Sequence, residues 1–270
     1  MMKPAKTFIL LLFICLCTTI TNAQKKPFYL SFEADSDSLH VLVENPFHCP
    51  TFIRYQKLAD KSTTYVQLKE KEQQKILSFA SNEMDTIAIY KKYEFLGMSY
   101  GNPPLSSYDT LYNYALPFPK GKRYRVMQGQ NTKFTHMGPF SKYAIDFDMR
   151  VGQTVCAMRD GVVVRTVSKF NKGGRGKKYR DLANYIVLYH KDGLFTQYVH
   201  LKKDGVLVKA GDSVKRGQPI GYSGNTGMST APHLHFAVFK PTKKGLVSIP
   251  YILDSIPTRR YLKGKYAVND

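Results

Sequence analysis

The feature that most constrains the fold is a succession of short apolar segments, separated by glycine-containing turns, that fills the second half of the chain. Alternating apolar and polar residues over such lengths predict half-buried strands, and no stretch has the longer periodicity of an amphipathic helix. We therefore expect mainly antiparallel β-structure here. The expected strands cover residues 154–157, 161–167, 185–190, 195–201 and 235–239.

The first half contains further short alternating segments, at residues 28–32, 39–43, 51–55 and 86–90. Several short strands at this spacing predict a small β-sandwich, although residues 66–80 also fit a short helix. Residues 97–115 include Asn102-Pro103-Pro104 and are predicted to be a linker. The expected fold is thus all-β: a β-sandwich-like N-terminal domain over residues 24–96, the linker, and an antiparallel β-sheet domain with a C-terminal tail over residues 116–270.

Residues 1–23 have the pattern of a secretory signal peptide. Lys3 and Lys6 precede an apolar run from Phe8 to Cys17, and small residues follow at the expected cleavage position. That run is too short to span a bilayer, which needs about 20 residues. We expect cleavage before Gln24, export to the periplasm or the extracellular space, and no transmembrane segment in the mature chain.

Four cysteines are present, and two of them, Cys15 and Cys17, lie within the predicted signal peptide. A lipoprotein anchor at either position is the less favoured alternative, because neither follows a pair of small residues. The mature chain would keep only Cys49 and Cys156, which excludes a disulfide-based scaffold. These two either pair in an oxidising compartment or remain buried thiols.

Charge is distributed unevenly along the chain. Residues 24–120 contain 11 basic and 11 acidic residues, whereas residues 121–270 contain 27 basic and 9 acidic ones, a net charge of +18. A surface this basic attracts polyanions, and for an exported protein anionic envelope polymers are more plausible partners than nucleic acid. The alternative is that the charge only maintains solubility. Six basic residues lie within 169–180, a predicted exposed loop that either borders a groove or is a solvated tip.

The acidic residues of the second half are all aspartates, so the H-E-x-x-H class of zinc proteases is excluded there. His233 and His235 are two residues apart in a strand-like segment and share one face. They either bind one ion together, or one binds it while the other transfers protons. Asp146 lies between Ile145 and Phe147, where an unpaired buried carboxylate would be costly.

His136 precedes this aspartate by ten residues, and two histidines with one carboxylate and an open fourth position are typical of catalytic zinc. Asp148 lies on the same strand face as Asp146 and is an alternative ligand. His40 and His48 are interpreted as structural. His190 is also interpreted as structural, with a place near the site as the alternative.

Several of these segments together resemble the LytM/lysostaphin-type zinc metallopeptidase family. The resemblance covers roughly residues 116–239 and rests on His136 and on residues 143–147, 198–201, 208–227 and 231–236. Many members have three residues between the first histidine and the aspartate, whereas this chain has nine. The extra residues are expected to form a loop over the substrate groove.

The resemblance implies a site and an activity. It assigns one Zn²⁺ to His136, Asp146 and His235, and it makes His200 and His233 the catalytic pair. The implied function is a zinc endopeptidase that hydrolyses peptide bonds in peptidoglycan stem peptides or cross-links. The alternatives are a non-catalytic activator of another cell-wall hydrolase and a zinc-stabilised module that binds envelope glycans.

Overall fold

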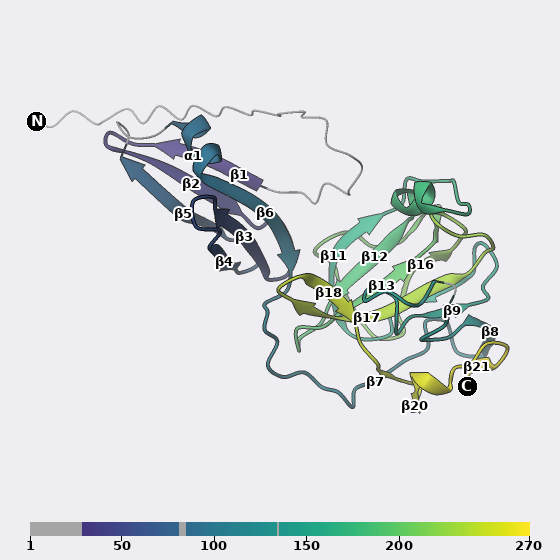
Figure 1. Cartoon of the computed structure of the whole chain (residues 1–270). Coiled ribbons are helices and arrows are strands. Elements are labelled where there is room, and N and C mark those ends of the chain that lie inside the picture. Colours follow the sequence, from purple (N-terminus) through teal and green to yellow (C-terminus); the bar gives the residue numbers. More distant parts are fainter. Residues whose placement is uncertain (1–28, 81–84, 134) are drawn as a thin grey trace, which may run out of the picture. The chain divides into compact units, whose positions relative to one another are not determined.

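The computed structural model describes residues 29–80, 85–133 and 135–270, so the predicted signal peptide lies outside the described residues. The chain divides into two compact units. The first comprises the described residues up to Pro46 together with Ile53–Met98, and the second comprises Phe47–Phe52 and Ser99–Asp270. Figure 1 shows the strands of each unit, coloured along the sequence.

The first unit consists of two three-stranded sheets. One is antiparallel and has the order β1-β2-β5, and the other has the order β4-β3-β6. Val41, Val43, Ile53 and Leu68 are fully or almost fully buried in this unit. The ambiguous residues 66–80 form the end of β4, a turn and β5 rather than a helix. The strands are β1 (Tyr29–Ala34), β2 (Ser38–Glu44), β3 (Thr51–Lys57), β4 (Thr63–Leu68), β5 (Gln73–Ala80) and β6 (Tyr93–Tyr100).

The strand expected at residues 86–90 is wrong, because this segment forms the helix α1 (Thr86–Lys92). The side chain of Asp85 accepts a hydrogen bond from the backbone N–H of Ala88 at 2.7 Å, which is a standard N-cap. Lys91 and Lys92 occupy the last turn, where positive charge favours the helix dipole. These end effects outweigh the apolar alternation of the short segment.

The second unit is built on a nine-stranded sheet of order β15-β11-β12-β13-β17-β9-β8-β21, with β18 paired to β17. Every recorded pair in this sheet is antiparallel, which confirms the expected all-β class. Its strands are β8 (Lys122–Gln128), β9 (Ile145–Phe147), β11 (Gly161–Val167), β12 (Tyr185–Tyr189), β13 (Phe195–Val199), β15 (Ser213–Val214), β17 (Leu234–Thr242), β18 (Gly245–Ser248) and β21 (Tyr266–Asn269).

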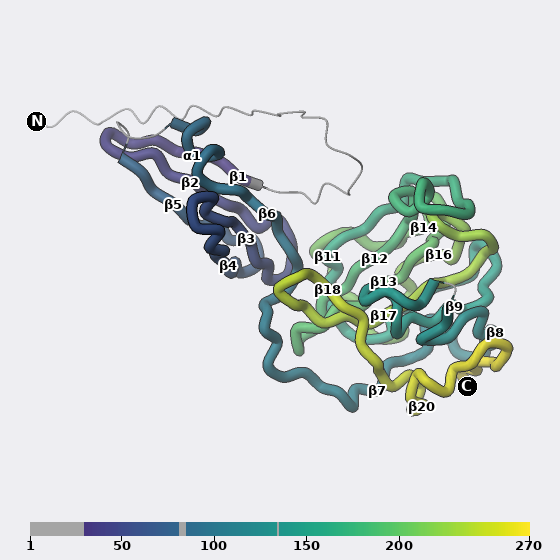
Figure 2. Tube along the Cα trace, in the orientation of Figure 1, coloured from purple at the N-terminus to yellow at the C-terminus, as the bar shows by residue number. Residues whose placement is uncertain are grey.

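Two smaller sheets and two short 3₁₀ helices complete this unit, and Figure 2 follows the chain through them. The first small sheet has the order β10-β16-β14, and the second has the order β20-β19-β7. The elements are β7 (Asn113–Tyr114), β10 (Thr154–Cys156), β14 (Leu201–Val206), β16 (Pro219–Ser223), β19 (Ile252–Leu253), β20 (Ile256–Pro257), η1 (Lys177–Leu182) and η2 (Thr258–Arg260).

Alternate side chains of strand β17 pack on opposite faces of the large sheet. Leu234, Phe236 and Val238 pack into the larger hydrophobic cluster, whereas Ala237 and Phe239 belong to a second cluster. Since side chains alternate along a strand, His235 shares the face of the second cluster. Strand β17 therefore buries one face in the larger core and carries His235 on the other.

Residues 97–115 are not the free linker that the sequence suggested. Strand β6 continues to Tyr100, and the side chains of Leu105, Tyr108 and Tyr112 pack against the larger core of the second unit. Tyr114 is buried within that core. The large apolar and aromatic side chains of this segment cover the sheet of the second unit, to which the segment belongs from Ser99 onwards.

Residues Phe47–Phe52 also belong to the second unit, although the sequence placed them in the N-terminal domain. Cys49 is buried in the second cluster together with Phe195 and Phe239. Cys49 and Cys156 are both buried, and no disulfide joins them. Within the described part of the chain, no helix is long and apolar enough to cross a membrane.

Candidate metal centre and neighbouring histidines

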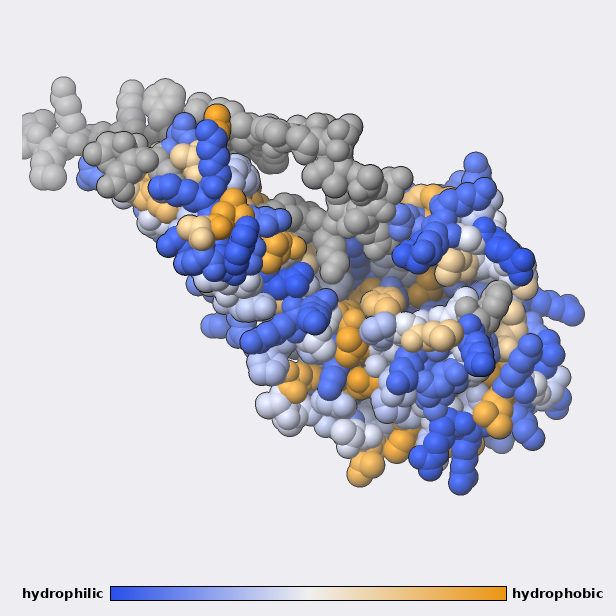
Figure 3. All heavy atoms as spheres, viewed as in Figure 1, coloured by the Kyte–Doolittle hydropathy of each residue, from blue (hydrophilic) through white to orange (hydrophobic). Residues whose placement is uncertain are grey.

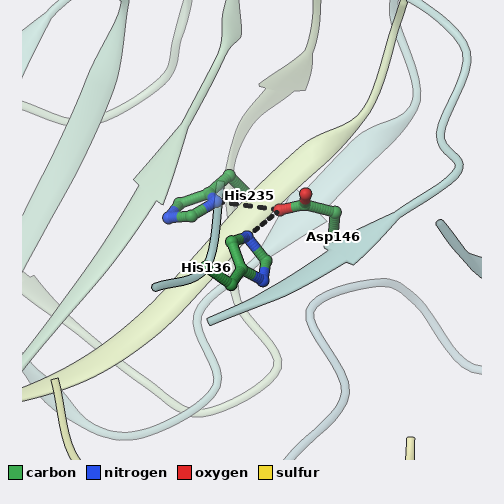
Figure 4. Close-up of side chains that lie close together, drawn as sticks. All are labelled: His136, Asp146 and His235. Carbon is green, nitrogen blue, oxygen red and sulfur yellow. Dashed lines mark hydrogen bonds and ion pairs between the residues drawn. The ribbon is translucent and has the colours of Figure 1, made fainter. Parts of the chain in front are cut away.

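Three side chains converge where β9 lies beside β17. The register of these antiparallel strands places His235 directly opposite Asp146. Oδ1 of Asp146 is 2.8 Å from Nδ1 of His235 and 3.3 Å from Nε2 of His136, and Figure 4 shows both rings directed at this oxygen. One ligand atom from each residue lies within 4.8 Å of the other two. The set can therefore hold one metal ion.

The buried Nε2 atom of His136 is independent evidence for a metal ion at this position. Its Nδ1 is 2.9 Å from the carbonyl oxygen of Gly129, to which it donates, and this leaves Nε2 as the free nitrogen. The residue is fully buried, yet Nε2 makes no hydrogen bond of good geometry, and its polar neighbour is the Asp146 carboxylate at 3.3 Å. Leaving such an atom unsatisfied costs about 1–3 kcal/mol, and a metal ion would satisfy it. Two imidazole nitrogens and one carboxylate oxygen are donors that fit zinc.

Protonation in the cluster also suits metal binding. Burial alone would raise the pKa of Asp146, but His235 and His136 beside it hold that pKa well below its usual value. Burial lowers the pKa of His235. Burial also opposes protonation of His136, but its contacts with Asp146 outweigh this and raise its pKa. An ionised carboxylate and neutral imidazoles are the forms that bind metals, so a cation would compete with the proton on His136.

His200 lies at the break between β13 and β14, next to the cluster. Its backbone has a φ of +68°, in the left-handed region that residues other than glycine seldom adopt. Its Nδ1 donates to the carbonyl oxygen of Thr226 at 2.7 Å, and its ring centroid is 4.5 Å from that of His233. Burial, helped by the neighbouring histidines, lowers its pKa to about 3. His200 is therefore neutral near pH 7, with Nε2 as its free nitrogen.

His233 is held in the same tautomer. Its Nδ1 is 2.8 Å from the carbonyl oxygen of Ala231 and 3.1 Å from the hydroxyl oxygen of Ser229. Its Nε2 is 4.0 Å from Oδ2 of Asp146. Both histidines thus use Nδ1 for support by the chain and keep Nε2 for chemistry at the cluster.

The other candidates from the sequence lie elsewhere. Asp148 forms an ion pair with Arg125 at 2.9 Å and is not part of the metal group, so Asp146 is the ligand candidate. His190 is fully buried between the carbonyl oxygen of Asp160 and the hydroxyl of Thr196, and it has a structural role. His40 pairs with Asp35 in the first unit, and His48 is also outside the metal group.

The long spacing between His136 and Asp146 does not separate the two residues. The connecting loop is anchored because Ser248 donates to the carbonyl oxygen of Pro139 through both its backbone N–H, at 2.8 Å, and its hydroxyl, at 2.9 Å. The ring of Phe140 also packs against that of Phe239, with 4.5 Å between the two ring centroids. These contacts account for how nine intervening residues still bring both ligands together.

Sequence reasoning missed the residues that orient the histidines. The carbonyl groups of Gly129, Thr226 and Ala231 accept hydrogen bonds from the three rings, and Ser229 supports His233. A backbone carbonyl leaves no signature in side-chain identity. Only Ser229 carried a possible signal, since its small polar side chain lies four residues before His233.

A buried His-Asp-His cluster flanked by two more histidines on an antiparallel sheet defines a metallohydrolase-type centre. Residues 140–246 match the model of Peptidase family M23, so this part of the second unit is a domain of that family. His136 lies just before the matched range, but the structure brings it to the other two ligands.

Two curated relatives and one solved structure are similar to this chain. Peptidoglycan DD-endopeptidase ShyA of Vibrio cholerae is 34% identical over 159 residues, which are 56% of this chain and 34% of that protein. Glycyl-glycine endopeptidase ALE-1 of Staphylococcus capitis is 48% identical over 95 residues, 35% of this chain and 23% of that protein. The matches thus span about a third or less of these relatives. The catalytic domain of lysostaphin from Staphylococcus simulans is 35% identical, with 47% of this chain and 82% of that domain covered and a TM-score of 0.32.

Proposed function

We propose that this protein is a zinc-dependent endopeptidase that hydrolyses peptide bonds in peptidoglycan stem peptides or cross-links. The observation that carries the proposal is the convergence of a three-residue metal group with two histidines whose Nδ1 atoms are bound by backbone carbonyls, so that Nε2 is the nitrogen turned to the cluster. The match to the model of Peptidase family M23 supports it, as do relatives named for endopeptidase activity. We include export to the periplasm or the extracellular space in the proposal, because peptidoglycan lies there.

His136, Asp146 and His235 would hold the zinc ion through Nε2, a carboxylate oxygen and Nδ1. When bound, zinc supplies Lewis-acid activation of water and of the scissile carbonyl group. The backbone carbonyl of Gly129 fixes the ring of His136 in the orientation required for this role. Asp146 is 5% exposed, which keeps competing water away from the carboxylate.

His200 and His233 would carry the proton transfers. One histidine, neutral, would take a proton at Nε2 from the attacking water. The other, protonated from solvent beforehand, would donate a hydrogen bond to the developing oxyanion and then its proton to the leaving amine, and the first would return its proton to solvent. Both rings are preorganised because backbone carbonyls bind their Nδ1–H groups. Their ring centroids are close enough, at 4.5 Å, for both to face one substrate bond.

The test incubates the mature protein with cross-linked peptidoglycan, with and without a zinc chelator, and identifies the released peptides by mass spectrometry. We expect new peptide termini that disappear when the chelator is present. An activator without its own activity, or a glycan-binding module, would bind the wall but release no peptide. That result would overturn the proposal.

Variants separate the two groups of histidines. His235→Ala should lose both zinc and activity, whereas His200→Ala should keep one zinc per chain and lose activity. His40→Ala, in the first unit, is the matched control and should retain both. Normal turnover by His200→Ala would refute the catalytic assignment.

A further inference from the structure

The most cationic segment of the chain lies against the part of the chain that holds the catalytic histidines. We call residues 169–180 the basic loop. Its six basic side chains are all exposed: Lys169, Lys172, Arg175, Lys177, Lys178 and Arg180. No acidic residue lies within it, although Asp181 follows directly. Figure 3 shows hydrophilic side chains gathered where this loop projects from the second unit.

The basic loop is fastened to residues 225–229 through its backbone. Gly173 forms a parallel bridge with Gly227, the N–H of Gly227 donates to the carbonyl of Lys172 at 2.9 Å, and the N–H of Gly174 donates to the carbonyl of Gly227 at 3.0 Å. A Cβ atom at Gly173 would lie 2.0 Å from the carbonyl oxygen of Asn225. Only glycine allows the backbone to come this close.

The segment 225–229 in turn holds both catalytic histidines. The carbonyl of Thr226 accepts from His200, and the hydroxyl of Ser229 contacts both His233 and the side chain of Asn225. Only the segment 225–229 therefore lies between the bonded part of the basic loop and the two histidines, His200 and His233. Its position beside the site is fixed by hydrogen bonds.

A buried asparagine anchors the other end of the loop to the same network. Asn184 is fully buried, accepts from the N–H of Phe170 at 3.0 Å and donates to the carbonyl of Phe170 at 2.8 Å. Its own N–H donates to the hydroxyl of Thr226 at 3.0 Å. The chain is thus held at Phe170, near the start of the loop, and at Asn184, four residues beyond its end, so the base of the loop stays at the edge of the site.

We propose that the basic loop selects substrates that carry free carboxylates beside the scissile bond, and that the enzyme therefore acts on stem peptides in preference to uncharged glycine bridges. This inference rests on the proposed function. Its chemical reason is that exposed Lys and Arg side chains steer and bind anionic groups, whereas an uncharged chain gains nothing from them. The loop itself carries six positive charges and no acidic residue, and the first acidic residue after it in the sequence is Asp181.

The first experiment compares three substrates with the unmodified protein. These are a cross-linked stem-peptide dimer, the same dimer with its carboxylates amidated, and pentaglycine. We expect kcat/KM to be highest for the charged dimer and to fall at least tenfold upon amidation. The advantage should shrink towards 1 M salt, where screening acts over about 3 Å.

The second experiment neutralises the loop. The variant combines Lys172→Gln, Arg175→Gln and Lys177→Gln, whose side chains are exposed. The matched control removes the same charge at three exposed lysines on other turns of the unit, with Lys120→Gln, Lys191→Gln and Lys209→Gln. We expect kcat/KM for the charged dimer to fall about tenfold in the loop variant, mainly through KM, and to fall much less in the control.

The outcomes separate this inference from the proposed function. If none of the substrates is cleaved, the proposed function fails. If the charged and amidated dimers are cleaved equally well, or if pentaglycine is preferred, the enzyme stands and the role of the loop is refuted. Equal losses in the loop variant and the control would also refute it, because net charge rather than the loop would then be responsible. The substrate comparison decides the question even if a variant fails to fold.

Discussion

The buried ring of His190 makes the stability of the second unit depend on pH. The ring is fully buried, and its Nδ1 donates to the carbonyl of Asp160 at 2.7 Å. Its Nε2 is 3.0 Å from the hydroxyl of Thr196, which donates to it. Burial lowers the pKa of His190 from 6.5 to about 4, because the neutral ring already has both partners and a charge would be desolvated.

The sign follows from proton binding in the two states. Between pH 6.5 and pH 4 the unfolded chain binds a proton at this histidine, whereas the folded protein does not. The contribution of His190 is therefore fully present above pH 6.5 and is lost as the pH falls towards 4. A shift of this size corresponds to about 3 kcal/mol of unfolding free energy.

The assay is urea unfolding of zinc-loaded protein between pH 7 and pH 4, comparing wild type with His190→Asn. The asparagine amide can still donate to Asp160 but does not titrate. We expect the wild type to lose about 3 kcal/mol more than the variant over this range, since all other groups contribute to both proteins. Parallel stability curves would refute the reasoning, and so would a His190 ring resonance that titrates near pH 6.5 in NMR.

Three further predictions concern the metal, the basic loop and the core. Chelation should lower the melting temperature and zinc, but not magnesium, should restore it, because ligand at 1,000 times its Kd adds about 4 kcal/mol; an unchanged melting curve would contradict the metal site. Gly173→Ala should reduce kcat/KM for peptidoglycan while zinc content stays at one per chain, because its Cβ would displace the basic loop; unaltered kinetics would show that the loop position is unimportant. Tyr198→Phe should destabilise the second unit by about 1–3 kcal/mol in urea unfolding, because the buried N–H of Met158 loses its acceptor at 2.8 Å; a neutral result would mean that another acceptor replaces it.

The alternation of apolar and polar residues in the sequence predicted the strands whose formation depends on that local pattern. Strand β11 has the bounds expected from its apolar residues, and the common face of His233 and His235 follows from strand geometry. The helix at Thr86–Lys92 was missed because the alternation of its apolar residues fits a strand. The N-cap hydrogen bond of Asp85 favours the helix instead.

Features that depend on tertiary contacts were outside the reach of such patterns. The expected strand at 195–201 breaks at His200, whose left-handed backbone and bond to Thr226 involve residues far along the chain. The packing of residues 97–115 onto the second unit likewise depends on a sheet formed much later in the sequence. The orienting carbonyls could not be predicted, because every residue carries one.

The assignment of Phe47–Phe52 to the second unit limits how this protein can be divided. The carbonyl of Pro50 accepts from the N–H of Gly101 at 2.7 Å, and Cys49 is fully buried beside aromatic residues from β13 and β17. A deletion that ends at residue 98 would therefore remove a piece of the core of the second unit along with the first unit. Anyone who transfers the second unit to another protein must carry these six residues with it, and recombination between the two units would face the same obstacle.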